Sequence, residues 1–101
     1  MPIPPDIHGQ KYICLITFRR TGDVVSTPVW FAEKDDKLYV KTRRDSGKAK
    51  RIRNNPRVRV ASCTISGKVT GPEFEAYARI STNWFLEARF RDRPLQVEDG
   101  N

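Results

Sequence analysis

The sequence has few of the side chains that bind metals. Its single histidine, His8, lies in a proline-rich stretch, and its two cysteines, Cys14 and Cys63, do not form a CxxC pair. A protein metal site generally needs three or four ligands, so no metal site is predicted. Both cysteines lie within apolar runs, which favours buried thiols in a reducing compartment.

Long apolar runs are absent too. No stretch approaches the roughly 20 apolar residues of a membrane-spanning helix, and no segment has the pattern of a signal peptide. We therefore expect a cytoplasmic protein without a membrane partner. A chain of 101 residues suits one domain, and a domain this small often gains stability by pairing with a second copy.

Positive charge is present in excess. The chain has 19 lysines and arginines against 12 acidic residues, a formal net charge of +7, which indicates an anionic partner. Nine of the basic residues lie between Lys41 and Arg59, with Asp45 as the one acidic residue among them. This basic segment could bind a nucleic acid backbone, bind the phosphate of a cofactor, or simply be hydrated.

The hydrophobic pattern predicts a mainly β domain. Residues 1–10 hold three prolines and a glycine and are interpreted as a leader without regular structure. Alternating or continuous apolar runs predict strands at 11–19, 24–32, 37–42, 57–64 and 73–80. Turns are expected at 20–23 and 33–36, and a turn or mobile loop at 65–72. Five strands of this kind suggest a small antiparallel barrel.

A short helix interrupts the strands after the third one. Ala49, Ile52 and Arg53 recur at helical spacing, Asp45 or Ser46 can cap the first turn, and Pro56 stops the helix. The stretch 83–91 has two interpretations, a second short helix capped by Thr82 or Asn83, or an edge strand. The predicted domain therefore spans residues 11–91, and residues 92–101 are interpreted as a tail.

The start of this helix has the chemistry of a phosphate site. Ser46 offers a hydroxyl, Gly47 lets an anion approach the backbone, and Lys48 places a charge on the first turn, where the helix dipole favours anions. Nucleic-acid binding is the alternative, but single-strand binders interleave exposed aromatics with charge, and no aromatic lies between Lys41 and Arg59. This separation of the aromatic residues from the basic segment favours an anion pocket over a nucleic-acid-binding surface.

Three stretches carry a family resemblance: PVWF at 28–31, LYVKT at 38–42 and DSGKAKRIRNNPRV at 45–58. They resemble the pyridoxamine 5'-phosphate oxidase-like family of FMN-binding split barrels, and most of all its branch of small oxidoreductases that use the deazaflavin coenzyme F420. The resemblance covers about residues 11–80 and is most specific at 41–58. It implies a small antiparallel split β-barrel, a homodimer, and FMN or F420 bound at the subunit interface.

The resemblance also implies which residues hold the cofactor. Lys41 and Thr42 match the strand end that hydrogen-bonds the cofactor, and Ser46, Gly47 and Lys48 match the phosphate-binding stretch. Pro28, Val29 and Trp30 match the second-strand segment that lies along the ring system. Pro28 cannot donate to a strand ladder, so an edge or a bulge is expected there.

The sequence departs from the family at two places. The oxidases of the family have an arginine where this chain has Gly47, which argues against the vitamin-converting oxidase itself. The family continues after the fifth strand with a helix and a final strand, whereas the 21 residues after Ile80 do not match that pattern. A shortened barrel with an incomplete pocket is therefore one expectation.

Hydride transfer to an unknown small molecule is the function that the resemblance implies. A cofactor carrier without its own catalysis and a basic nucleic-acid-binding module are the alternatives. No side chain stands out as acid, base or nucleophile, so no catalytic residue is predicted. Stacking on the ring and packing in the core are both open to Trp30 and Tyr39, and the core is preferred because both lie in apolar runs.

Overall fold

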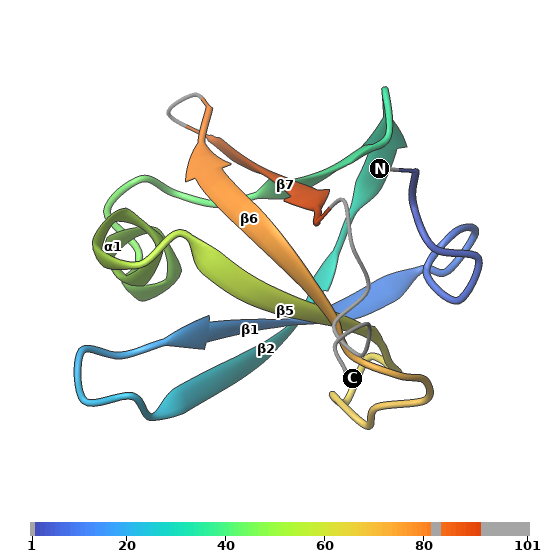
Figure 1. The fold of residues 1–101 in the computed structure, drawn as a ribbon, viewed down its shortest axis with the longest axis horizontal. Helices are drawn as coiled ribbons and strands as arrows, with labels where there is room; N and C mark the ends of the chain where they lie inside the picture. Colours follow the sequence, from blue (N-terminus) through green and yellow to red (C-terminus); the bar gives the residue numbers. More distant parts are fainter. Residues whose placement is uncertain (1, 82–83, 92–101) are drawn as a thin grey trace, which may run out of the picture.

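One antiparallel sheet of seven strands makes up most of the molecule, and it curls into a half-open barrel (Figure 1). The computed structural model describes residues 2–81 and 84–91. The strands are β1 (Tyr12–Phe18), β2 (Val24–Trp30), β3 (Ala32–Lys34), β4 (Lys37–Lys41), β5 (Arg57–Ser62), β6 (Phe74–Ile80) and β7 (Phe85–Phe90). One helix, α1 (Gly47–Asn54), lies between β4 and β5. The predicted fold class, mainly β and antiparallel with a short helix, is confirmed.

The order of strands in the sheet is β2-β1-β5-β6-β7-β4-β3. The predicted strand 24–32 is wrong as a single element, because the chain breaks at Phe31 into β2 and β3. These two strands follow each other in sequence yet form the opposite edges of the sheet. The sheet must therefore curl until its edges approach each other, and β2 also contacts β4.

The β1–β2 and β3–β4 hairpins form where the sequence predicts turns. Gly22 has φ of 93°, a left-handed conformation that costs glycine nothing. Asp35 and Asp36 have φ of 53° and 62°, the paired left-handed residues of a tight hairpin turn. β1 is buried from Ile13 to Thr17 because it is an inner strand, as its unbroken apolar run predicts.

β7 corrects both interpretations of the stretch 83–91. It is neither a helix nor an edge strand, because it pairs with β6 on one side and with β4 on the other. Leu86, Ala88 and Phe90 alternate toward the core, which is the ordinary pattern of an inner strand. The stretch after Ile80 thus joins the two parts of the barrel, which corrects the expectation of a barrel shortened there. The predicted caps Thr82 and Asn83 and the tail 92–101 lie outside the described residues.

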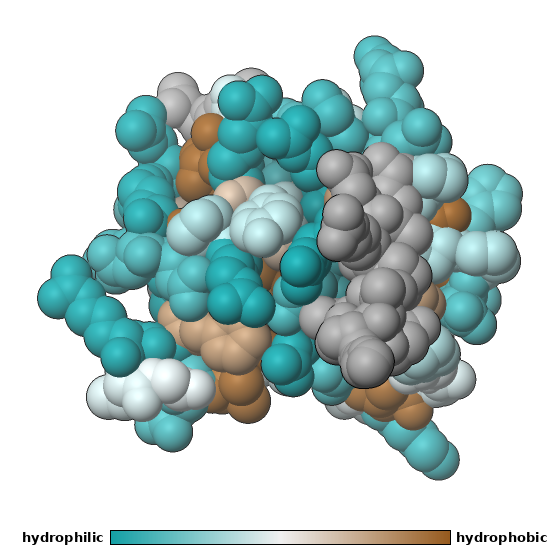
Figure 2. All heavy atoms as spheres, in the orientation of Figure 1, coloured by the Kyte–Doolittle hydropathy of each residue, from teal (hydrophilic) through white to brown (hydrophobic). Residues whose placement is uncertain are grey.

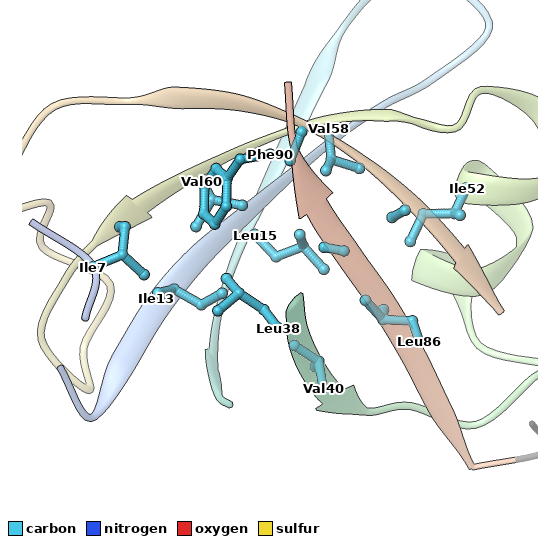
Figure 3. Packing of buried hydrophobic residues seen from close by; sticks show 13 residues of the cluster. Ile7, Ile13, Leu15, Leu38, Val40, Ile52, Val58, Val60, Leu86 and Phe90 are labelled. Carbon is cyan, nitrogen blue, oxygen red and sulfur yellow. The ribbon is translucent and has the colours of Figure 1, made fainter. Parts of the chain in front are cut away.

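The core is formed by aliphatic side chains from nearly every element, as Figure 3 shows. Its larger members are Ile7, Ile13, Leu15, Leu38, Val40, Ile52, Val58, Val60, Leu86 and Phe90. Phe74 meets Phe90 edge to face at 6.2 Å between ring centres, a favoured aromatic geometry.

The leader has no helix or strand, as expected, but it belongs to the core. Ile7 is completely buried, which an unattached leader does not explain. Beside it, Glu33 of β3 accepts hydrogen bonds from the Gly9 N–H at 2.9 Å and from the His8 ring at 2.6 Å. Burial would raise the pKa of Glu33, but these two contacts outweigh it and the pKa is lowered. These hydrogen bonds therefore hold the leader against β3, an edge strand of the sheet.

Polar side chains cover most of the face shown in Figure 2, with smaller apolar areas between them. Among residues 2–81 and 84–91, no helix combines the length and the hydrophobicity that crossing a bilayer requires. The same residues contain no cluster of three side chains suited to a metal ion.

Candidate functional site

Thr42, immediately after β4, has a buried hydroxyl without a partner. Its backbone N–H donates to the Trp84 carbonyl at 2.6 Å, which fixes its position, and the residue is only 4% exposed. Its Oγ1 makes no hydrogen bond to any described residue. An unsatisfied buried hydroxyl costs about 1–3 kcal/mol, so such an atom suggests a ligand that completes it.

The helix that follows starts as the sequence predicts. Ser46, not Asp45, is the N-cap, and its Oγ accepts the Ala49 N–H at 3.2 Å. α1 has no acidic residue in its first turn, so nothing there neutralises the positive end of the dipole. Lys48 is half-buried on this turn and makes no hydrogen bond or ion pair with any described residue. The Lys48 ammonium therefore has no partner among the described residues, and it belongs to the same turn as the first N–H groups of the helix.

The Arg51 guanidinium lies against Gly47 in this first turn. A Cβ added there would approach only the Arg51 guanidinium, at 2.9 Å, and that is the end of a flexible side chain. Arg51 in turn donates from Nε to the Thr17 hydroxyl at 2.7 Å, which holds α1 against β1. Arg51 thus has a structural role. Lys48 is the cation of the first turn, and it has no such role among the described residues.

The second predicted group, Pro28 to Trp30, lies on the edge strand β2. Pro28 stands opposite Cys14 of β1, so the expectation of an edge position is correct. Val29 packs against the core. The preference for Trp30 in the core is wrong: it is 70% exposed and rests against Tyr12 at 6.2 Å between ring centres. Its indole is therefore available for stacking.

The turn after β5 lies beside Pro28, and its backbone makes more hydrogen bonds than the sequence predicts. The Cys14 thiol donates to the Gly67 carbonyl at 3.4 Å, and a Cβ on Gly67 would lie 3.6 Å from Pro28 Cγ. The Thr70 N–H donates to the Ser62 carbonyl at 2.9 Å. The turn predicted at 65–72 is therefore present and carries an isolated bridge between Cys63 and Val69, while its mobility stays a prediction.

Two residues that sequence reasoning missed lie next to Thr42. Trp84 is 57% exposed and Phe85 is 43% exposed, and with Lys41 they line a shallow apolar hollow of about 410 Å³. The sequence signal for Trp84 and Phe85 was that two aromatic residues are neighbours at the start of a strand. It was missed because the stretch 83–91 could be interpreted as a helix or as an edge strand. Aromatic faces and a lysine beside an unsatisfied hydroxyl suit a planar, partly anionic ligand.

Two other arginines of the basic segment form ion pairs on the sheet. Arg57 pairs with Glu75 of β6 at 2.9 Å, and Arg59 pairs with Glu73 at 3.4 Å while lying 5.7 Å over the Phe18 ring. They point away from the core, as their alternation predicts. These two positions thus have a structural explanation.

The predicted residues form two groups, one at Lys41–Lys48 and one at Pro28–Trp30. Among the described residues, no hydrogen bond or ion pair in the structure links them. A sequence model of the pyridoxamine 5'-phosphate oxidase family matches residues 5–97, almost the whole chain. A comparison with curated proteins gives no match.

Proposed function

Because the chain belongs to the pyridoxamine 5'-phosphate oxidase family, we propose that it is an oxidoreductase that binds FMN or coenzyme F420. The family supports a flavin-binding split barrel, and the strand order and curled sheet agree with that fold. When bound, either cofactor supplies the hydride chemistry, and the protein supplies position, electrostatics and exclusion of water. The proposed substrate is a small molecule.

The observation that carries this proposal is the unsatisfied hydroxyl of Thr42 beside the start of α1. Ser46, Gly47 and Lys48 would hold the phosphate, by the hydroxyl, the first N–H groups and the ammonium. Lys41 and Thr42 would contact the polar edge of the cofactor. Pro28, Val29 and Trp30 would lie along its rings, with Trp30 exposed as stacking requires.

A homodimer is part of the proposal. In one chain the two groups of residues lie on different strands, and a second copy could bring Pro28–Trp30 of one subunit to Lys41–Lys48 of the other. Exposed apolar side chains at Val24, Trp30 and Ile65 would gain from burial in such an interface. Activity in the cytoplasm fits an enzyme with two unpaired thiols, Cys14 and Cys63.

Titration of FMN and of F420 into two lysine variants tests the proposal. Loss of a charge-assisted contact to phosphate costs about 1.5–3 kcal/mol, so Lys48→Ala should weaken cofactor binding by roughly tenfold to a hundredfold. Lys50→Ala is the matched control, because Lys50 is an exposed lysine of the same helix. It should change binding by less than about threefold.

A single-stranded oligonucleotide is titrated in parallel. If it binds more tightly than both cofactors, and if the two variants weaken its binding equally, the basic segment binds nucleic acid and the cofactor proposal is wrong. Cofactor binding without turnover of any reductant or acceptor would instead indicate a carrier protein.

A further inference from the structure

A second cavity lies between α1 and the end of β6, next to the candidate cofactor site, since Arg44 of the segment 41–48 lines it. It has a volume of about 520 Å³ and combines apolar side chains with three arginines. Figure 1 shows α1 to the lower left of the arrowhead of β6, and the Ala78 N–H donates at 2.8 Å to the carbonyl of Pro56, which lies between α1 and β5. Neither Thr42, Ser46 nor Lys48 lines this cavity.

The floor of the cavity is rigid and apolar. It includes Ile52 of α1 and Ala78 of β6, which are 2% and 3% exposed because they also belong to the main core. Ile80 is half-buried and packs against the same core. In Figure 3, Ile52 extends from the helix toward the core. A floor held by core packing keeps its shape without a ligand.

Arginines from three separate segments line the cavity: Arg44 before the helix, Arg53 within it, and Arg79 on β6. Arg53 donates to the backbone carbonyl of Arg44, an acceptor that does not neutralise its charge. Arg79 donates from both Nε and Nη2 to Glu87 at 3.3 Å, on the face of the sheet opposite to Ala78 and Ile80, so its guanidinium is engaged there. The charge of Arg53 is therefore the one that remains for the cavity.

No carboxylate lines this cavity within residues 2–81 and 84–91. We propose that the cavity is a binding site for a small amphipathic anion, a molecule with an apolar or aromatic body and a carboxylate, phosphate or sulfonate group. Ile52, Ala78 and Ile80 would contact the body, and Arg53 would hold the charged group through the N–H donors that its bond to the Arg44 carbonyl leaves open. Its volume is within the range of small-molecule sites, about 300–1,000 Å³.

The test uses 8-anilinonaphthalene-1-sulfonate, a fluorescent anion of this class, and the cofactor-free full chain. Arg53→Gln removes the guanidinium that would hold the charged group. Loss of one charge-assisted contact should weaken binding by roughly tenfold or more. Arg89→Gln is the matched control, because Arg89 is an exposed arginine of β7 that does not line the cavity. It should change binding by less than about twofold. Urea unfolding of each variant verifies that it is folded.

Two further measurements locate the probe. Phenyl phosphate should displace it, whereas phenol, which has the same ring without the charge, should not. Amide NMR shifts should concentrate at Ile52, Arg53, Ala78 and Ile80, and saturating FMN should leave them unchanged. Shifts concentrated at Thr42 and Lys48 instead, or an equal loss of binding in Arg89→Gln, would overturn the second site. Neither result depends on whether the cofactor proposal is correct.

Discussion

Thr42 and Thr17 are both buried threonines, but their hydroxyl groups differ in what they contact. Thr17 Oγ1 accepts from Arg51 at 2.7 Å and lies 3.4 Å from the Val25 carbonyl, whereas Thr42 Oγ1 has no partner among the described residues. We expect Thr42→Val to raise the stability of the cofactor-free protein by about 1 kcal/mol, because an unsatisfied buried hydroxyl is removed. The same change should weaken cofactor binding by roughly threefold to tenfold.

Thr17→Val is the control for this prediction. It should lower stability, because it leaves the Arg51 guanidinium without its acceptor. Denaturant unfolding and cofactor titration of both variants give the comparison. If Thr42→Val destabilises the cofactor-free protein as much as Thr17→Val does, the hydroxyl of Thr42 has a structural role and is not reserved for a ligand.

At the scale of elements, two buried carboxylates join the strands of the β5–β6–β7–β4 region. Glu75 on β6 pairs with Arg57 of β5 and with Arg91, and its side chain is 8% exposed. Glu87 on β7 pairs with Lys37 of β4 and Arg79 of β6. Burial would raise the pKa of each carboxyl, but the hydrogen bonds from their basic partners outweigh it, and both pKa values are lowered.

Lowered pKa values predict sensitivity to acid. A carboxyl whose pKa is lower in the folded state stabilises the fold above its unfolded pKa, and this contribution is lost as pH falls through the folded value. We therefore expect the urea midpoint to hold between pH 7 and about pH 5 and to fall steadily below about pH 4.5. Glu75→Gln should lower stability at pH 7 and flatten the acid dependence.

Glu73→Gln is the matched change, at the residue just before the same strand. Its ion pair with Arg59 is 44% exposed on the Glu73 side, so its removal should alter the urea midpoint little. An acid dependence of Glu75→Gln as steep as that of the unmodified chain would show that other groups control acid unfolding.

Local chemistry explains which elements could be predicted from the sequence. Helix α1 was predictable because Ser46, Ile52 and Pro56 specify its cap, its buried face and its stop within one short stretch. The placing of Thr42 just before the capped start of α1 was predictable for the same reason, since these residues are neighbours in the chain, and their role in binding stays a prediction. The exposure of Trp30 was not, because an apolar run does not reveal which of its faces the sheet leaves uncovered.

Long-range pairing explains what could not be predicted. The place of β7 between β6 and β4 depends on partners that are distant in sequence, so its short apolar alternation stayed ambiguous. The break at Phe31 depends on how far the sheet curls, which no local pattern records. The core position of Ile7 follows from the fit of the leader against the finished barrel.

At the scale of the whole molecule, the exposed apolar residues predict a dimer. Light scattering at tens of micromolar protein, a rough working range for stable pairs, should give the mass of two chains. Trp30→Ser should weaken the dimer by about thirtyfold or more, as expected for an aromatic residue at the centre of an interface. Trp30→Phe should preserve it. A monomer at all these concentrations, with or without FMN, would contradict a site shared by two subunits.

The position of β7 also determines when the barrel can form. Without β7 the sheet falls into two pieces, β2-β1-β5-β6 and β4-β3, because no other strand within residues 2–81 and 84–91 joins them. A chain that is still being synthesised therefore exposes the open edges of β4 and β6 until residues 85–90 have left the ribosome. Exposed strand edges recruit other chains. The barrel thus depends on its last strand for protection from aggregation during its own synthesis.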